Sequence, residues 1–397
     1  MSPNRARHRR RRQENLRSHF WRRVAVVGSA LVVVGGTALA VVRLETPVHH
    51  AGRAHAGATT STRQNSAQSV TTTTTRAVEP VTISAVGDTD LGNTPNLPPD
   101  PAAYLQPVEA ALQGPIVFAN LEGTMTDAAT SKCAPTSTNC YAFRNPPSDA
   151  QVLRAIGFTV INSANNHSHD FGSQGAADTT AALEGAGIVQ AGLPGQIGIV
   201  NAGTTKVAFV DFAPYSNTND LLDFPTAKSL IVQAKSEADV VVVYMHAGAE
   251  GSDAVHVTGS EETYVGEDRG NAKAFAHAAI DDGADLVIAS GPHVLRGMEE
   301  YEGHLIAYSL GNFCGYQNFA TGGVLSLSGI LTVTLTGNGV FTGGHFTSLL
   351  LTGVGQPTID SSGAAARFVN GLSSADFGAS AVTILPSGQI SLPAQPA

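Results

Sequence analysis

The chain has 397 residues and a formal net charge of −9, from 23 basic and 32 acidic residues. The charge is unevenly distributed, because residues 81–397 hold 10 of the basic and 29 of the acidic residues, a net charge of −19. Such a region is not expected to bind nucleic acid or an anionic lipid surface, since both repel it. It suits divalent cations, although a solubilising acidic surface explains most of these acids equally well.

The N-terminus predicts a membrane segment. Residues 1–23 carry nine arginines and one acid and are predicted to be a basic cytoplasmic tail. Residues 24–42 carry no charge, and a helix of that length just crosses a hydrocarbon core of roughly 30 Å. The flanking arginines place the N-terminus in the cytoplasm and the rest of the chain outside. A cleavable signal peptide ending near Ala38–Ala40 is the alternative; we favour an uncleaved anchor, because signal-peptide cores are usually shorter.

Residues 43–80 are rich in Thr, Ser and Ala and show no apolar period, which predicts a disordered linker. Residues 81–397 are long enough for one large domain. The prediction is therefore a single-pass protein of the cell membrane with an extracellular domain, whose first partner is the membrane itself.

Short apolar runs that end on acidic, amide or histidine side chains recur through the domain and predict buried strands. These runs are Val81–Asp88, Ile116–Glu122, Phe158–His167, Val207–Pro214, Val240–His246, Leu286–His293 and Leu305–Asn312. Helical patterns lie between them, at Pro101–Leu112, Ser148–Ile156, Gln174–Ala186 and Ala272–Ile280. Strands that alternate with helices predict the α/β class.

The C-terminal part changes character after Gly323. Gly329–Leu335, His345–Leu351 and Ala381–Leu392 are predicted strands joined by Gly-rich turns, and Asp360–Leu372 is a weaker helix prediction.

The three cysteines fall into two groups. Cys133 and Cys140 bracket a polar stretch, and in an exported domain a small disulfide is the expected pairing. Cys314 is expected to be a buried small residue, because no activating base adjoins it in the sequence.

Carboxylates follow the first two strands. Asp88 lies in GDTD and Glu122 in ANLEG, each directly after an apolar run. A carboxylate at a strand end is a good ligand for a hard cation, but Asp and Gly are also ordinary turn residues. In the same turn, Asp90 is expected to serve the turn or cap a helix.

The segment NSANNHSHDFG, residues 162–172, is the densest polar cluster. Asn166 followed by His167 suits a site in which the amide binds a metal and the imidazole protonates a leaving oxygen. Asp170 can accept a hydrogen bond from the imidazole and fix its tautomer. The alternative is a polar turn that caps the next helix.

Histidines end two later strands. His246 begins HAGAE after a run of apolar residues, and His293 ends SGPH, where the proline stiffens the turn. Each histidine alone is as well explained by a core or surface position. Because ligands gather at the carboxyl ends of strands in α/β sheets, five such strand ends can together bind one or two divalent ions.

The collinear order of GDTDLG, ANLEG, NSANNHSHDFG, HAGAE, GADLVIASGPHVLRGMEEYEG and IAYSLGNF resembles the CapA/PgsA family of capsule and poly-γ-glutamate biosynthesis proteins. That family is similar to calcineurin-like metallophosphoesterases. The resemblance implies a four-layer α/β/β/α sandwich with two divalent ions, drawn from Mn, Zn, Fe or Mg, between the sheets. Matched position by position, the implied metal ligands are Asp88, Glu122, Asn166, His246 and His293, with His167 and its partner Asp170 in the catalytic role.

One departure concerns a ligand. Family members often carry a further histidine before the Pro-His turn, where this chain has Ala289-Ser290-Gly291. Serine is a poor metal ligand, so one tighter and one weaker ion are expected.

Three functions follow from these motifs. The first is an envelope-anchored, metal-dependent hydrolase or transferase of the phosphoesterase kind, acting in capsule or poly-γ-glutamate production. The second is a non-catalytic accessory subunit of a membrane polymer synthase or exporter, which keeps the fold and a structural metal. The third is a cation-dependent module that binds wall carbohydrate.

Overall fold

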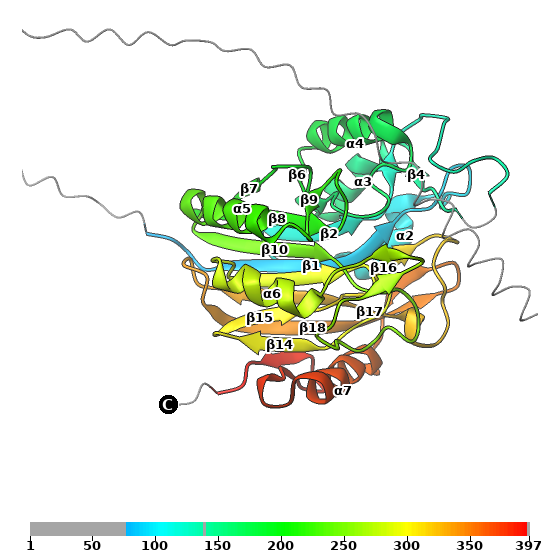
Figure 1. Cartoon of the computed structure of the whole chain (residues 1–397). Helices are drawn as coiled ribbons and strands as arrows, with labels where there is room; N and C mark the ends of the chain where they lie inside the picture. The colour runs from blue at the N-terminus through cyan, green and yellow to red at the C-terminus, as the bar shows by residue number, and fades with distance from the viewer. Residues whose placement is uncertain (1–76, 138–139, 395–397) are drawn as a thin grey trace, which may run out of the picture. The chain divides into compact units, whose positions relative to one another are not determined.

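The computed structural model describes residues 77–137 and 140–394 (Figure 1). The predicted tail and membrane segment, and the linker as far as residue 76, lie outside these residues. Across the described ranges, no helix combines the length and the apolar content that crossing a membrane requires.

Two large sheets and two small ones make up the described part. Within it, ten strands form the first large sheet, in the order β20 (Thr383–Ile384), β21 (Gln389–Ser391), β18 (Phe341–Thr352), β17 (Leu327–Leu335), β1 (Val81–Asp90), β2 (Ile116–Leu121), β5 (Val160–Asn162) and β6 (Val189–Ala191), with β16 (Asn312–Gly315) beside β1 and β19 (Gln356–Ile359) beside β18. In the same residues, seven strands form the second, in the order β14 (Met298–Tyr301), β15 (His304–Ala307), β13 (Leu286–Ser290), β10 (Val240–His246), β8 (Thr205–Ala213) and β7 (Gly198–Ala202), with β9 (Asn219–Asp220) beside β8. The small sheets pair β3 (Thr124–Met125) with β4 (Arg144–Asn145) and β11 (Thr263–Tyr264) with β12 (Glu267–Asp268).

Helices cover the outer faces of the large sheets, except for the last one, which packs against strands of both sheets (Figure 1). They are α2 (Pro101–Glu109), α3 (Asp149–Ile156), α4 (Gly172–Ala186), α5 (Phe224–Glu237), α6 (Ala272–Asp281) and α7 (Ala364–Phe377), with short 3₁₀ turns at η1 (Gly323–Ser326) and η2 (Gly378–Ser380). Helices α2, α3 and α4 share an apolar cluster with the first sheet, and α5 and α6 share one with the second. Helix α7 contributes Ala365, Ala366 and Val369 to the core between the sheets.

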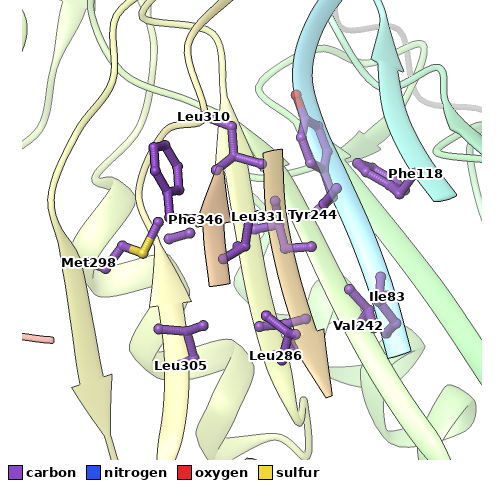
Figure 2. Close-up of a cluster of buried hydrophobic side chains, with 14 of the residues drawn as sticks. Ile83, Phe118, Val242, Tyr244, Leu286, Met298, Leu305, Leu310, Leu331 and Phe346 are labelled. Atoms are coloured by element: carbon purple, nitrogen blue, oxygen red, sulfur yellow. The ribbon is translucent and has the colours of Figure 1, made fainter. Parts of the chain in front are cut away.

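The central core lies between the two sheets (Figure 2). Phe118 of β2 stacks on Phe209 of β8 at 5.4 Å between ring centroids, and Tyr244 of β10 lies 5.3 Å from Phe118. Such aromatic pairs add about 0.5–1.5 kcal/mol beyond their area burial. All seven residues of β10 are buried, which is why its sequence is a continuous apolar run rather than an alternating one.

The α/β class and most of the predicted elements are confirmed. The predicted run Val240–His246 coincides with β10, and Gly157 and Gly187 end α3 and α4 in the left-handed conformation, at φ 118° and 70°. Of the predicted run Phe158–His167, only Val160–Asn162 is strand. The polar residues after it form the turn that leads to α4.

One prediction in the C-terminal part is wrong. Ala381–Leu392 is not one strand but two, β20 and β21, joined by a turn in which Gly388 has φ 91° and donates its N–H to the carbonyl of Leu385 at 2.8 Å. Pro386 and Gly388 interrupt the extended chain because proline lacks an N–H and glycine accepts the positive φ.

Candidate metal centre

The candidate residues lie where the parallel strands of the two sheets end. Asp88 belongs to β1 and Glu122 follows β2, and these strands are parallel neighbours in the first sheet. His246 ends β10 and His293 follows β13, which are parallel neighbours in the second. Since the sheets pack face to face, these strand ends meet at one edge of the sandwich.

Local backbone features aim Asp88 into the gap between the sheets. The register between β1 and β2 shifts between Ala85 and Asp88, as at a β-bulge, which re-aims side chains near functional sites. Asp88 N–H donates to the Gly311 carbonyl at 2.9 Å. A Cβ at Gly87 would stand 1.9 Å from that carbonyl oxygen, so only glycine permits this close approach.

Asp88, Glu122 and His293 each place one ligand atom within 4.8 Å of the other two. His293 Nδ1 lies 3.1 Å from Asp88 Oδ2, and its Nε2 lies 3.5 Å from Glu122 Oε1. His293 has φ 59°, an unusual backbone conformation for a residue other than glycine and one that recurs at functional sites. Two carboxylates and an imidazole at this spacing form a set that can hold a divalent cation.

His246 lies at the same centre. Its Nε2 is 3.9 Å from Glu122 Oε1 and has no hydrogen-bond partner among the described residues, while its Nδ1 lies 3.3 Å from Tyr244 Oη. Burial lowers the pKa of His246 well below its usual value. The ring is therefore neutral at pH 7, the form in which imidazole binds a metal.

Glu122 is fully buried, and neither of its carboxylate oxygens has a hydrogen-bond partner in the described part of the chain. Burial, followed by the charge of Asp88, raises the pKa of Glu122 well above its usual value. A buried carboxylate without a partner costs several kcal/mol, roughly, in a folded protein. A bound cation would remove this cost.

The remaining charges at the centre respond to the same carboxylates. Burial alone would raise the pKa of Asp88, but its contacts with His293 and the Ser290 hydroxyl lower it to about 2. Burial alone would lower the pKa of His293, but Glu122 and Asp88 raise it to about 10. The proton on His293 thus supplies the positive charge that the carboxylates require.

A chain of amides holds Asp88 in place. Asn120 Nδ2 donates to Asp88 Oδ1 at 2.8 Å. The side-chain oxygen Oδ1 of Asn120 in turn accepts from Asn162 Nδ2 at 2.6 Å and from Asn165 Nδ2 at 2.9 Å. These two bonds fix which way the Asn120 amide points, so its N–H₂ group faces the carboxylate. Asn120 was not among the predicted site residues.

His167 is oriented by Asp170. Its Nδ1 lies 2.8 Å from Asp170 Oδ2, and its Nε2 lies 4.0 Å from Glu122 Oε1, on the side of the candidate centre. Asp170 is fixed by the Phe143 N–H at 2.6 Å and by Lys132 Nζ at 2.6 Å. This is the contact that the predicted role of Asp170 requires; the catalytic roles themselves stay predictions.

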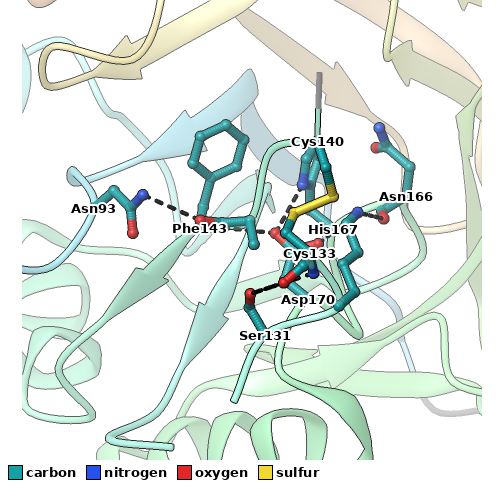
Figure 3. Close-up of a disulfide and its surroundings, with 10 residues drawn as sticks. Asn93, Ser131, Cys133, Cys140, Phe143, Asn166, His167 and Asp170 are labelled. Carbon is teal, nitrogen blue, oxygen red and sulfur yellow. Dashed lines mark hydrogen bonds and ion pairs between the residues drawn. A yellow bond between two sulfur atoms is a disulfide. The ribbon is translucent and has the colours of Figure 1, made fainter. Parts of the chain in front are cut away.

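The predicted disulfide is present between Cys133 and Cys140, next to this histidine (Figure 3). Cys140 lines a cavity together with Asn166 and His167. Cys314 is fully buried, as predicted. The disulfide therefore secures the loop that borders the candidate centre.

Three further residues complete the comparison with the sequence. The Oδ1 atom of Asn166 is buried, and no described residue donates a hydrogen bond to it, so the predicted role of Asn166 as a ligand stays a prediction. Ser290, which stands where a histidine was expected, donates its hydroxyl to Asp88 Oδ1. Asn312, which was not among the predicted site residues, places its Oδ1 2.8 Å from His293 Nδ1 and so orients that ring.

The comparisons with known proteins support the family. Residues 82–317 match the model of the family described as bacterial capsule synthesis protein PGA_cap. The chain is 36% identical to the PGA biosynthesis protein CapA of Bacillus subtilis strain 168, over 41% of this chain and 44% of the relative. It is 30% identical to the capsule biosynthesis protein CapA of Bacillus anthracis, over 41% of each. The match thus spans less than half the length of these two relatives.

Among solved structures, a 5′-nucleotidase precursor from Thermus thermophilus aligns with a TM-score of 0.37 and 13% identity, over 68% of this chain and 54% of that one. A score this low supports no conclusion about activity. Because the family model covers more than half of the sequence, the chain belongs to the bacterial capsule synthesis protein PGA_cap family.

Proposed function

We propose that this chain is a metal-dependent, phosphoesterase-like hydrolase that acts in capsule or poly-γ-glutamate production. One observation carries the proposal: the two oxygens of Glu122 and Nε2 of His246 are buried and lack hydrogen-bond partners among the described residues, beside Asp88 and His293. Buried acceptor atoms without hydrogen bonds destabilise a folded protein. When several of them converge, they can bind a cation.

The residues present fit divalent cations. Asp88, Glu122 and His293 would hold one ion, and His246 and Asn166 offer ligands for a second, weaker one; Mn, Zn, Fe and Mg are the candidates. When bound, such a cation acts as a Lewis acid toward an ester oxygen. The binding of two ions is itself proposed. Ser290 donates its hydroxyl to Asp88 and so offers no ligand to the second ion.

The protein's own contribution to the chemistry is positional. Asp170 holds His167 so that Nε2 faces the centre, and Lys132 pairs with Asp170 from the other side. In this arrangement His167 can give a proton to a leaving oxygen, because Asp170 holds the ring with Nε2 toward the centre. The strands that carry the candidate residues, such as β10 and β13, are buried, so the centre is shielded from water on their side.

We further propose that residues 24–42 anchor the chain in the cell membrane, with the domain outside the cell and subunits of a membrane polymer synthase or exporter as its partners. The disulfide supports the extracellular location, because such bonds persist in oxidising compartments. Labelling of an engineered exposed cysteine by a membrane-impermeant reagent in intact cells tests the location; labelling only after lysis would contradict it.

The full chain, stripped of metal and assayed on an aryl phosphate ester with added Mn²⁺ or Zn²⁺, tests the activity. Turnover that requires metal, and that Asp88→Asn and His167→Gln both abolish, is the expected result. His345→Gln, an exposed histidine on β18, serves as the matched control and should retain activity.

A second candidate is the non-catalytic accessory subunit. One observation favours it: Ser290 binds the carboxylate of Asp88 where a further ring nitrogen was expected. Metal binding without turnover on any phosphoester would support this alternative over the hydrolase.

A further inference from the structure

Two arginines are almost fully buried, and they differ in how their guanidinium groups are satisfied. Arg269 is 1% exposed and Arg296 is 0% exposed. Each of the three nitrogens of the Arg296 guanidinium has a hydrogen-bond partner. Nη1 and Nη2 donate to the two oxygens of Glu262 at 2.9 and 2.7 Å, and Nε donates to the Ala254 carbonyl at 2.8 Å. This arginine is a structural tie between loops.

The guanidinium of Arg269 has only part of its hydrogen bonds among the described residues. Nη1 donates to Glu250 Oε1 at 2.8 Å, but Nε and Nη2 are buried without a hydrogen-bond partner in the described residues. These two nitrogens form one edge of the planar guanidinium, the edge that binds the two oxygens of a carboxylate or phosphoryl group in parallel. Leaving buried donors of a charged group unmatched is costly, which points to a bound anion.

The surroundings of Arg269 supply a place for that anion. Arg269 lines a cavity of about 300 Å³ together with Asn166 and His167, and Lys132 lies on the same wall. Of the acids there, Glu250 is bonded to Arg269, and Glu267 accepts from the Tyr215 hydroxyl at 3.0 Å. Arg269 thus lines the cavity that also holds the proposed proton donor, and its two unpaired nitrogens lie just beneath the cavity surface.

We propose that Arg269 binds an oxyanion of the substrate, a phosphoryl or carboxylate group that occupies this cavity beside His167. That this oxyanion belongs to a substrate rests on the proposed function. It makes Arg269 a specificity-determining residue, because a substrate without a negative charge at this position would leave the guanidinium edge unpaired. Glu250 holds the guanidinium in place for this contact.

Anion binding by the full chain tests the inference without any turnover. Titration calorimetry is run with inorganic phosphate and separately with glutarate, once in chelator and once with Mn²⁺. We expect the unsubstituted chain to bind at least one probe, Arg269→Met to bind it about 10- to 100-fold more weakly, and Arg269→Lys to be intermediate. Arg154→Met, an exposed arginine on α3, is the matched control and should bind as the unsubstituted chain does.

The probes separate the two sources of the oxyanion: a preference for phosphate indicates a phosphoryl group, and a preference for glutarate indicates a carboxylate. Equal binding by Arg269→Met and the unsubstituted chain, or no binding of either probe, would overturn the inference. If Arg269→Met does not fold, a crystal of the unsubstituted chain grown with phosphate is the alternative test. Phosphate density beside Nε and Nη2 supports the inference, and its absence overturns it. Binding in chelator that depends on Arg269 would stand even if no hydrolase activity is found.

Discussion

Replacing Glu122 by glutamine should change the stability of the protein in opposite directions with and without metal. In the metal-free chain, the substitution removes a fully buried carboxylate whose oxygens lack hydrogen-bond partners among the described residues. Neutral replacement of such a charge stabilises by about 1–3 kcal/mol. At about 2–4 °C per kcal/mol, the midpoint of thermal unfolding should rise by about 2–12 °C in chelator.

With metal the order reverses. A cation at a concentration a thousandfold above its Kd stabilises the unsubstituted chain by about 4.1 kcal/mol, which exceeds the gain from the substitution, and Glu122→Gln should lose most of this stabilisation. Thermal unfolding followed by far-ultraviolet circular dichroism, in chelator and in Mn²⁺, measures both effects. Glu184→Gln, an exposed position on α4, is the matched control. A variant that is less stable than the unsubstituted chain in chelator would refute the reasoning.

Three further predictions concern residues outside the candidate ligands. Burial raises the pKa of Asp211 well above its usual value, so its charge destabilises increasingly as pH rises above about 4, and Asp211→Asn should add about 1–3 kcal/mol to the unfolding free energy at pH 7. Burial would raise the pKa of Glu299, but contacts led by His277 hold it at about 2; urea titrations should show about 2–3 kcal/mol lost from pH 4.5 to pH 2, and less in Glu299→Gln. Reduction of Cys133–Cys140 should cost about 2 kcal/mol, measured as a lower urea midpoint; an unchanged midpoint would contradict this.

Much of the site could be predicted because its residues are local to the strands that carry them. Asp88, Glu122, His246 and His293 each end or follow a buried apolar run, and parallel strands bring such ends to one edge. The sequence therefore indicates the convergence without any knowledge of the strand order.

The supporting contacts could not be predicted in the same way. The amide chain depends on the register that pairs Asn120 with Asn162 across β2 and β5, and register is a tertiary property. Arg269 stands in a polar loop, where nothing in the spacing of residues reveals that its side chain will be buried. A long-range contact, not a local pattern, makes it part of the site.

Two errors in the secondary structure have local causes. Helix α5 was not predicted, although Asp223 caps its N-terminus by accepting from Thr226 N–H at 3.2 Å and Pro225 lies in its first turn. Both are ordinary helix-start signals that the mixed sequence after them obscured. The residues of Ala381–Leu392 are mostly those of a strand, but Pro386 is a turn signal and divides the segment into β20 and β21.

Anomalous diffraction from crystals of the full chain grown with Mn²⁺ tests the central claim most directly. The account predicts a peak about 2.0–2.6 Å from a carboxylate oxygen of Asp88, a carboxylate oxygen of Glu122 and a ring nitrogen of His293. A peak bound elsewhere, or no peak while these three side chains keep their positions, would contradict it.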